Sequence, residues 1–136
     1  MAWVVDTSVV LDLVTGDPQF EPASTLCLQK HLNDGLVVCP VSFIELGPAF
    51  AGDDVAASAF LNGAGIETGE AWTSHDTALA HRLWSDFQAR RRQTVLARRP
   101  VADVMIAAFA ARFQGLITRN ASDFRNIVPT VALIKP

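Results

Sequence analysis

The sequence predicts an α/β fold in which a mostly parallel sheet is covered by helices on both faces. Short apolar runs at 2–5, 36–41 and 115–118 are typical of buried strands. Longer stretches with helical periodicity separate these runs, and strands that alternate with helices form parallel sheets. Half of the residues are apolar, which is enough for a substantial core. We therefore expect a single domain spanning residues 1–136, with right-handed connections between its strands.

The first elements follow from the apolar runs and the residues that stop them. Strand 2–5 leads into a short helix from Ser8 to Val14, which the turn sequence TGDP ends. A helix from Pro22 to Asn33 follows, with Gly35 as its stop. The candidates for burial on this helix are Leu26, Cys27 and Leu32.

The middle of the chain predicts two more strands and two more helices. LVVCPV at 36–41 is short and β-branched, so we expect a buried strand. SFIELGPAFAG at 42–52 predicts a helix that Gly47-Pro48 would kink. Residues 53–65 predict another helix with Asp53 as its N-cap, and GIET at 65–68 a short strand.

The second half contains two long helical patterns. Residues 73–93 predict an amphipathic helix that Thr73 or Ser74 caps, with its apolar face formed by Leu79, Leu83 and Phe87. Residues 101–113 are apolar on nearly every side, which predicts a helix buried on both sides. Its two stripes are Val101, Met105, Ala108 and Phe109, and Ile106, Ala110 and Phe113. Strands at 115–118 and 130–134 complete the fold.

Charge and cysteine usage indicate a cytoplasmic protein without a membrane span. No stretch of 18 residues is free of charge, and the N-terminus lacks the pattern of a signal peptide. Cys27 and Cys39 lie among apolar residues without metal-ligand spacing, so we expect reduced core thiols. The net charge of −3 does not by itself indicate nucleic-acid binding, but five of the eleven basic residues fall in residues 90–99, so a local basic patch can exist.

Polar residues follow the predicted strands at positions that a parallel sheet would bring together. Asp6 follows the first strand, and Glu45 lies one turn into the helix after the second. Asp103 begins the buried helix, and Asn120 and Asp123 follow strand 115–118. Since ligands of such sheets bind beyond the carboxyl ends of the strands, we expect these groups to meet at one edge.

Each of these residues also has a purely structural interpretation. Asp6 could be an N-cap, Glu45 a solvated helix residue, and Asp103 an acid favoured by the helix dipole. Asn120 and Asp123 could cap a short turn. Their coincidence at one edge carries the functional interpretation, because clustered carboxylates cannot all remain ionised without a cation. Hard oxygen ligands suit Mg²⁺ or Mn²⁺, and two such ions can support phosphodiester hydrolysis.

The same segments resemble the PIN-domain ribonucleases, and among them the VapC-type toxins of bacterial toxin–antitoxin systems. The resemblance covers essentially the whole chain, in VVDTSVVLDL, PVSFIELGPAF, VADVMIAAFAARFQGLITRNASDF and VALIKP. It implies a three-layer α/β/α sandwich and a Mg²⁺- or Mn²⁺-dependent endoribonuclease. It also implies a homodimer that a cognate antitoxin neutralises. The two apolar stripes of 101–113 also favour a dimer, because they exceed what one sheet face can cover.

The resemblance assigns roles to particular residues. Asp6, Glu45 and Asp103 match the family's acidic positions, and we expect Asp123 to be the fourth metal ligand, with Asn120 in support. The hydroxyls expected to orient these carboxylates are those of Thr7, Ser8 and Thr118. Arg119 is a candidate contact for the RNA backbone, and Arg98 and Arg99 for RNA or the antitoxin, although the basic run could also be a solvated helix end and loop.

Other functions fit the residues less well. A haloacid-dehalogenase-like phosphatase needs a second aspartate where this chain has Ser8, and a receiver domain needs a late lysine that neither Lys30 nor Lys135 supplies. A housekeeping RNA-processing nuclease would share all the site residues, and a catalytically silent binding module would share the fold. A neighbouring reading frame for a small DNA-binding antitoxin would separate toxin from housekeeping nuclease, and a metal-binding assay would separate either from a silent module.

Overall fold

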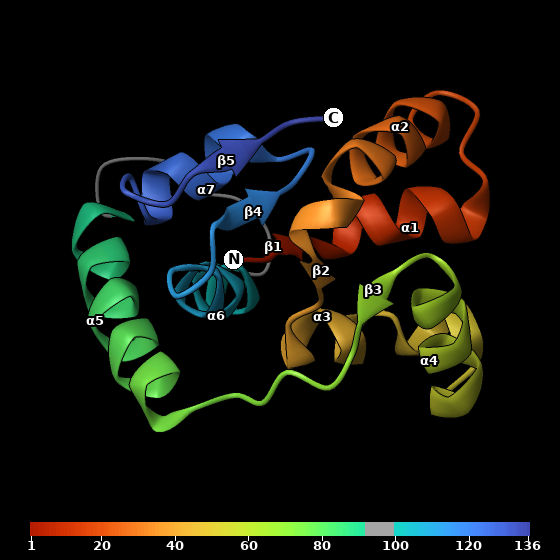
Figure 1. The fold of residues 1–136 in the computed structure, drawn as a ribbon. Coiled ribbons are helices and arrows are strands. Elements are labelled where there is room, and N and C mark those ends of the chain that lie inside the picture. The colour runs from red at the N-terminus through yellow and green to blue at the C-terminus, as the bar shows by residue number, and fades with distance from the viewer. Residues whose placement is uncertain (92–99) are drawn as a thin grey trace.

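The computed structural model describes residues 1–91 and 100–136, and its strands form one parallel five-stranded sheet in the order β3-β2-β1-β4-β5 (Figure 1). The strands are β1 (Trp3–Val5), β2 (Leu36–Val37), β3 (Ile66–Glu67), β4 (Gly115–Ile117) and β5 (Leu133–Ile134). The central strand β1 pairs Val4 with Val37 of β2 and with Leu116 of β4. Because all the pairings are parallel, the carboxyl ends of the strands share one edge of the sheet.

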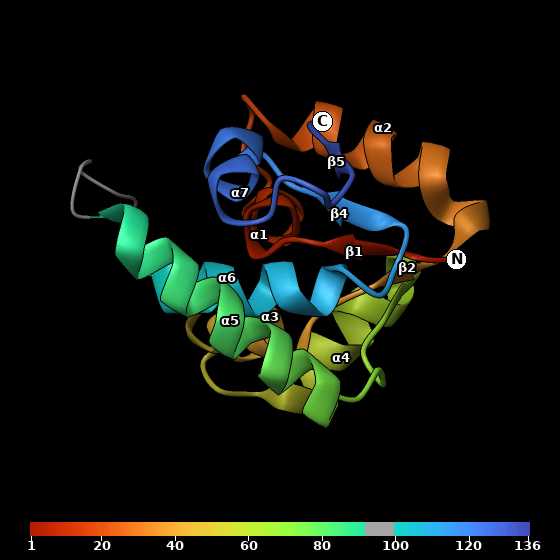
Figure 2. The same cartoon turned by 90° about the vertical axis from the view of Figure 1, so that its left-hand side faces the viewer.

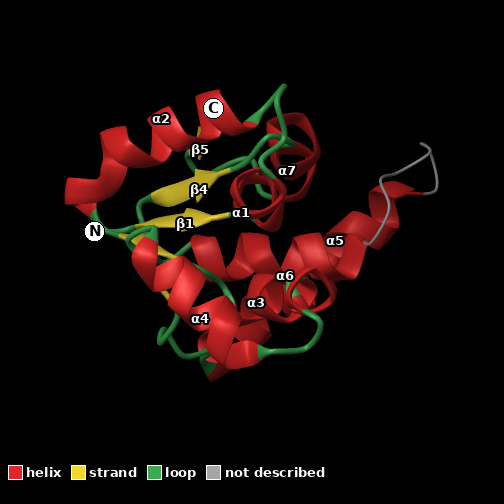
Figure 3. Ribbon diagram, turned by 90° about the vertical axis from the view of Figure 1, so that its right-hand side faces the viewer, coloured by secondary structure: helices red, strands yellow, loops and turns green. Residues whose placement is uncertain are grey.

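Helices cover both faces of this sheet, as Figures 2 and 3 show. The helices are α1 (Thr7–Thr15), α2 (Glu21–His31), α3 (Pro40–Glu45), α4 (Asp54–Gly63), α5 (Ser74–Arg91), α6 (Pro100–Ala110) and α7 (Ala121–Ile127). Side chains alternate along β1, so Val4 joins a core with α5, α6 and α7, while Trp3 and Val5 join a core with α1, α2 and α4. The predicted α/β class, with a parallel sheet between helical layers, is confirmed.

The buried helix α6 is covered from two sides within the same chain. Its residues from Ile106 to Ala110 are buried, in one core with Ala80 and Phe87 of α5. Trp72, just before α5, stacks on Phe109 with 6.3 Å between ring centroids. Much of the apolar surface of α6 is therefore covered by α5 and Trp72 within the same chain, which weakens the argument for a dimer contact, although Val101 of the first stripe is 49% exposed. The dimer itself stays a prediction.

Several predicted elements differ from those observed. The strand predicted at 36–41 ends at Val37, because Pro40 occupies the first turn of α3, a position that proline favours. Gly47-Pro48 ends α3 instead of kinking it, and a 3₁₀ turn (Gly47–Phe50) follows. The strand predicted at 130–134 consists only of Leu133 and Ile134.

For the helix predicted at 22–33, the predicted buried residues are partly wrong. The helix α2 ends at His31 and continues as a 3₁₀ turn (Leu32–Asp34). Leu26 and Leu32 are 68% and 48% exposed, while Leu28 and Ser24 are buried. The four-residue spacing of Ser24 and Leu28 sets the face that packs, and Leu26 lies between them on the opposite side.

Two capping predictions are confirmed by hydrogen bonds. Asp53 caps α4, and its Oδ1 accepts from the amide of Ala56 at 3.0 Å. Thr73 caps α5 in a reciprocal arrangement with Asp76: the Thr73 hydroxyl accepts from the Asp76 amide at 3.2 Å, and Asp76 Oδ2 accepts from the Thr73 amide at 2.9 Å. No helix within the described ranges is long and apolar enough to cross a membrane.

Candidate active site

The site begins at Asp6, where β1 ends and α1 begins. The backbone amide of Asp6 donates to Ile117 O at 2.9 Å, which continues the pairing of β1 with β4. Its side chain turns back to cap α1, and Oδ1 accepts from the amide of Thr7 at 2.8 Å. Asp6 is only 4% exposed. The capping role is therefore real, and it fixes one carboxylate oxygen at the carboxyl edge of the sheet.

Two hydroxyl groups fix the other carboxylate oxygen. Oδ2 of Asp6 accepts from Ser8 Oγ at 2.9 Å and from Thr118 Oγ1 at 2.7 Å. The Thr118 oxygen in turn accepts from the amide of Asn120 at 3.0 Å, so the chain leaving β4 is connected to the chain leaving β1. Asp6 is thereby held in one orientation by groups from two neighbouring strand ends.

A second carboxylate lies within the same hydrogen-bond network. Glu45 is the last residue of α3, and its Oε1 accepts from the hydroxyl of Thr7 at 2.8 Å. Thr7 therefore links the two acids, since its amide binds Asp6 and its hydroxyl binds Glu45. Burial raises the pKa of Asp6, and the charge of Glu45 raises it further, against the hydrogen bonds from Thr118, Ser8 and Thr7.

The other two predicted ligands stand at the beginnings of helices. Asp103 lies in the first turn of α6 and Asp123 in the first turn of α7, and both are half-buried. Within residues 1–91 and 100–136, no three His, Cys, Asp or Glu side chains are placed to hold one metal ion. The ligand set of Asp6, Glu45, Asp103 and Asp123 therefore stays a prediction.

The hydrogen-bond network around Asp6 has the oxygen atoms that a divalent cation needs as ligands. Among the described contacts, Oδ2 of Asp6 accepts two hydrogen bonds and Oδ1 accepts one. A carboxylate oxygen has about two acceptor positions, so Oδ1 keeps one for a ligand. The side chains joined in this network, those of Asp6, Thr7, Ser8, Glu45 and Thr118, carry only oxygen as the heteroatom, which is what Mg²⁺ and Mn²⁺ prefer.

Arg119 contacts Asp12 and Phe20 of the same chain. Its Nε lies 2.8 Å from Oδ2 of Asp12, and its guanidinium lies over the ring of Phe20, 4.0 Å from the centroid. Asp12 is buried and also accepts from Ser24 Oγ at 2.8 Å. Sequence reasoning missed Asp12, although an acid inside the apolar run SVVLDLV was a signal for a buried partner. The other two predicted contacts, Arg98 and Arg99, fall outside the described residues.

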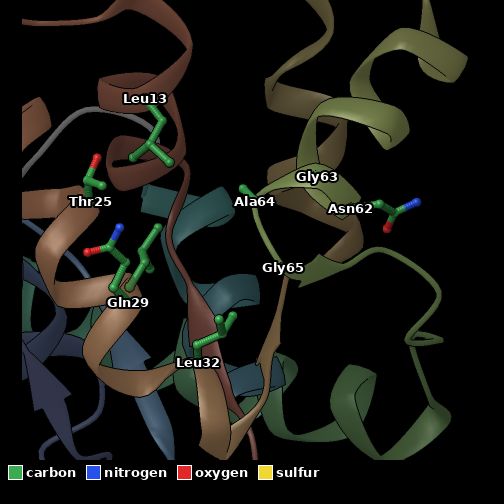
Figure 4. A pocket seen from close by; sticks show the side chains of 9 residues that line it. Leu13, Thr25, Gln29, Leu32, Asn62, Gly63, Ala64 and Gly65 are labelled. Carbon is green, nitrogen blue, oxygen red and sulfur yellow. The ribbon is translucent and has the colours of Figure 1, made fainter.

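A pocket of about 380 Å³ lies away from this network (Figure 4). It is bounded by the end of α1, by α2 and by the turn between α4 and β3, and its lining includes Leu13, Leu28, Leu32 and Gly65. Leu32 and Gly65 precede β2 and β3, so the pocket is at the amino-terminal edge of the sheet. None of the predicted site residues lines it.

The fold has a close counterpart among solved structures. The chain is similar to a chain of VapBC2 from Rickettsia felis, in a crystal structure bound to a DNA fragment from their promoter. The TM-score is 0.73 at 15% sequence identity, over 99% of this chain and 98% of that chain. No protein-family model matches the sequence, and none of the curated proteins matches significantly. At this identity the likeness establishes the fold, so the predicted PIN-like sandwich is confirmed at that level.

Proposed function

We propose that the chain is a metal-dependent endoribonuclease and the toxin of a toxin–antitoxin pair. One observation carries the proposal. A buried aspartate follows the central strand, fixed by three donors and linked through Thr7 to a second carboxylate, on a fold shared with a chain of VapBC2. Purely structural N-caps do not need a second acid, because the second acid raises the cost of ionising the first.

The network gives each residue a defined task. Thr118 and Ser8 bind Oδ2 of Asp6, and Oδ1, which accepts from the amide of Thr7, would use its remaining acceptor position for a ligand. Thr7 binds Glu45, and Asp103 and Asp123, in the first turns of α6 and α7, would complete the proposed acidic ligand set. When bound, Mg²⁺ or Mn²⁺ supplies Lewis-acid activation of water and neutralises charge on the phosphodiester. The hydroxyls would keep the carboxylates in place as the substrate arrives.

A cleavage assay with the purified protein tests this proposal. A single-stranded or looped RNA should be cut with Mg²⁺ or Mn²⁺ and remain intact with EDTA. Hydrolysis by an activated water leaves 5′-phosphate and 3′-hydroxyl ends, whereas attack by the ribose 2′-hydroxyl leaves a cyclic phosphate. Full activity in EDTA, or cyclic-phosphate products, would reject the proposed chemistry.

The toxin role needs a separate experiment, because a housekeeping nuclease would pass the cleavage assay. Expression of the wild-type chain should halt growth, and co-expression of the small DNA-binding protein encoded beside it should restore growth. Asp103→Asn, with the same soluble yield, should not halt growth. Normal growth under strong expression of an active wild-type chain would favour the housekeeping nuclease.

A further inference from the structure

The segment that leaves β4 contacts helix α1 at two places. Thr118 binds Asp6 at the N-cap of α1, and the next residue, Arg119, pairs with Asp12 in the same helix. The six residue steps from Asp6 to Asp12 advance about 9 Å along a helix. Two consecutive side chains therefore fix both the position and the direction of α1 relative to the end of β4.

Arg119 is held by more than its charge. Asp12 is 2% exposed, and its Oδ2 accepts from Ser24 Oγ of α2 and lies 2.8 Å from Arg119 Nε, in an ion pair that lacks the alignment of a hydrogen bond. Phe20 supports the guanidinium from the turn between α1 and α2. That turn is itself fixed, because Asp17 Oδ1 accepts from the amides of Gln19 at 2.8 Å and Phe20 at 3.3 Å.

We propose that Arg119 and Asp12 form a positioning pair for the candidate active site. The pair holds the 118–120 segment against α1, so that Thr118 keeps its hydrogen bond to Asp6 and Asn120 keeps its hydrogen bond to Thr118. This assignment rests on the proposed function for its catalytic consequence. It replaces the expectation that Arg119 binds the RNA backbone, since the arginine is already engaged by a buried carboxylate and an aromatic ring.

The chain contains a comparable ion pair outside the Asp6 hydrogen-bond network. Arg112 lies 3.1 Å from Asp76 through its Nε, and the guanidinium lies 4.6 Å from the centroid of Phe109. The exposures match closely, because both arginine side chains are 28% exposed and their partners 1% and 2%. Arg112 follows the carboxyl end of α6 and Asp76 lies in the first turn of α5, and in the part of the chain that the structure describes no hydrogen bond joins this pair to Asp6. Arg112 differs in one respect, because its Nε donates a hydrogen bond to Asp76.

The kinetic arm compares Arg119→Gln, Asp12→Asn and the double variant with Arg112→Gln, in RNA cleavage with Mn²⁺. Both single variants should lower kcat by about tenfold to a hundredfold, because small displacements of reacting groups have effects of that size. KM should stay within about twofold, and the double variant should be no slower than either single one. Arg112→Gln should keep wild-type kcat. A raised KM in Arg119→Gln, with normal kinetics in Asp12→Asn, would show an RNA contact and overturn the pair.

A conservative variant sharpens the distinction. Arg119→Lys keeps a positive charge for phosphate but loses the planar group that stacks on Phe20. A positioning residue should lose kcat on this change, whereas a phosphate contact should keep both kcat and KM.

The second arm needs no activity, so it separates failure of this inference from failure of the proposed function. Amide hydrogen exchange at Asn120 reports the bond to Thr118. Exchange should accelerate in Arg119→Gln and Asp12→Asn, and stay at the wild-type rate in Arg112→Gln, with α4 amides as the internal reference. Unchanged exchange at Asn120 in both site variants would overturn the pair even if the wild type cleaves RNA. Accelerated exchange in both site variants, together with a wild type that does not cleave RNA, would retain the pair and reject the nuclease.

Discussion

The hydroxyl of Thr118 donates a 2.7 Å hydrogen bond to Oδ2 of Asp6, although the two residues are 112 positions apart in the chain. The bond joins the ends of β1 and β4, which pair directly in the sheet. It is buried, and the same threonine oxygen accepts the amide of Asn120. One side chain therefore orients the carboxylate at the centre of the site and the segment that carries Asp123.

Thr118→Val should destabilise the protein, because it removes the hydroxyl. Valine has nearly the shape of threonine, so the change tests the hydrogen bonds and not the packing. The Asp6 carboxylate would lose a donor and the Asn120 amide an acceptor, and such buried losses cost about 1–3 kcal/mol. Urea unfolding at neutral pH measures the change. Thr118→Ser retains the hydroxyl and should lose clearly less stability, so equal losses for valine and serine would assign the effect to packing.

Asp6→Asn should stabilise the metal-free protein at neutral pH. Burial raises the folded-state pKa of Asp6 above its ordinary value of 3.8. The contribution of this group to stability is complete below the unfolded pKa and is lost as pH rises through the folded pKa. Asparagine carries no charge, so the variant should become more stable than the wild type as pH rises from about 3.8, the unfolded value, toward neutrality. Thermal melts in EDTA at pH 4 and pH 7 test this, and an asparagine variant that melts lower at both would identify Asp6 as a cap alone.

Mn²⁺ should raise the melting temperature of the wild-type protein. At a hundredfold excess over Kd, binding to the folded state contributes about 2.7 kcal/mol. Glu45→Gln should reduce this shift, because Glu45 is linked to Asp6 through Thr7. Asp53→Asn, at the start of α4, is the control acid and should respond as the wild type does. An equal Mn²⁺ shift in wild type and Glu45→Gln would remove Glu45 from the ligand set.

Gly115→Ala should be strongly destabilising through the packing of β4. A methyl group at this position would collide with the backbone oxygen of Ala132 and with the ring of Trp3, which is itself buried. Overpacking of this kind costs about 1–3 kcal/mol. Gly63→Ala is the matched control, because nothing lies within 4 Å of its added methyl and alanine favours a helix. Calorimetric melts of both variants should show a large loss for the first and none for the second.

The sheet could be predicted from sequence because its central strands are short, fully apolar runs, which are stable only when they are buried. WVV and GLI are buried at every position, so composition alone identifies them. The helix α7 was missed, since its seven residues ASDFRNI begin with a polar turn and are too few to show a period. The exposure of Leu26 depends on which face of α2 packs against α1. Tertiary packing decides this, and the local sequence pattern does not predict it.

The site divides in the same way. The places of Asp6 and of the hydroxyls of Thr7, Ser8 and Thr118 could be predicted because parallel topology and the family resemblance both put them after strand ends, and Glu45 because it lies on the helix that follows the second strand. The partnership of Arg119 with Asp12 could not, because a long-range ion pair leaves no periodic signal in one sequence. The role of Arg119 as an RNA contact was therefore predicted from its place beside the edge and stays a prediction, while its contact with Asp12 is the observation on which the proposed positioning pair rests.

The most direct test of the central claim is a map of new RNA 5′ ends in cells after brief expression of the wild type and of Asp6→Asn at equal soluble level. If Asp6 is the centre of a nuclease site, discrete 5′-phosphate ends should appear with the wild type and be absent with the asparagine variant. The same ends at the same abundance with both proteins, or no new ends with the wild type, would contradict the account.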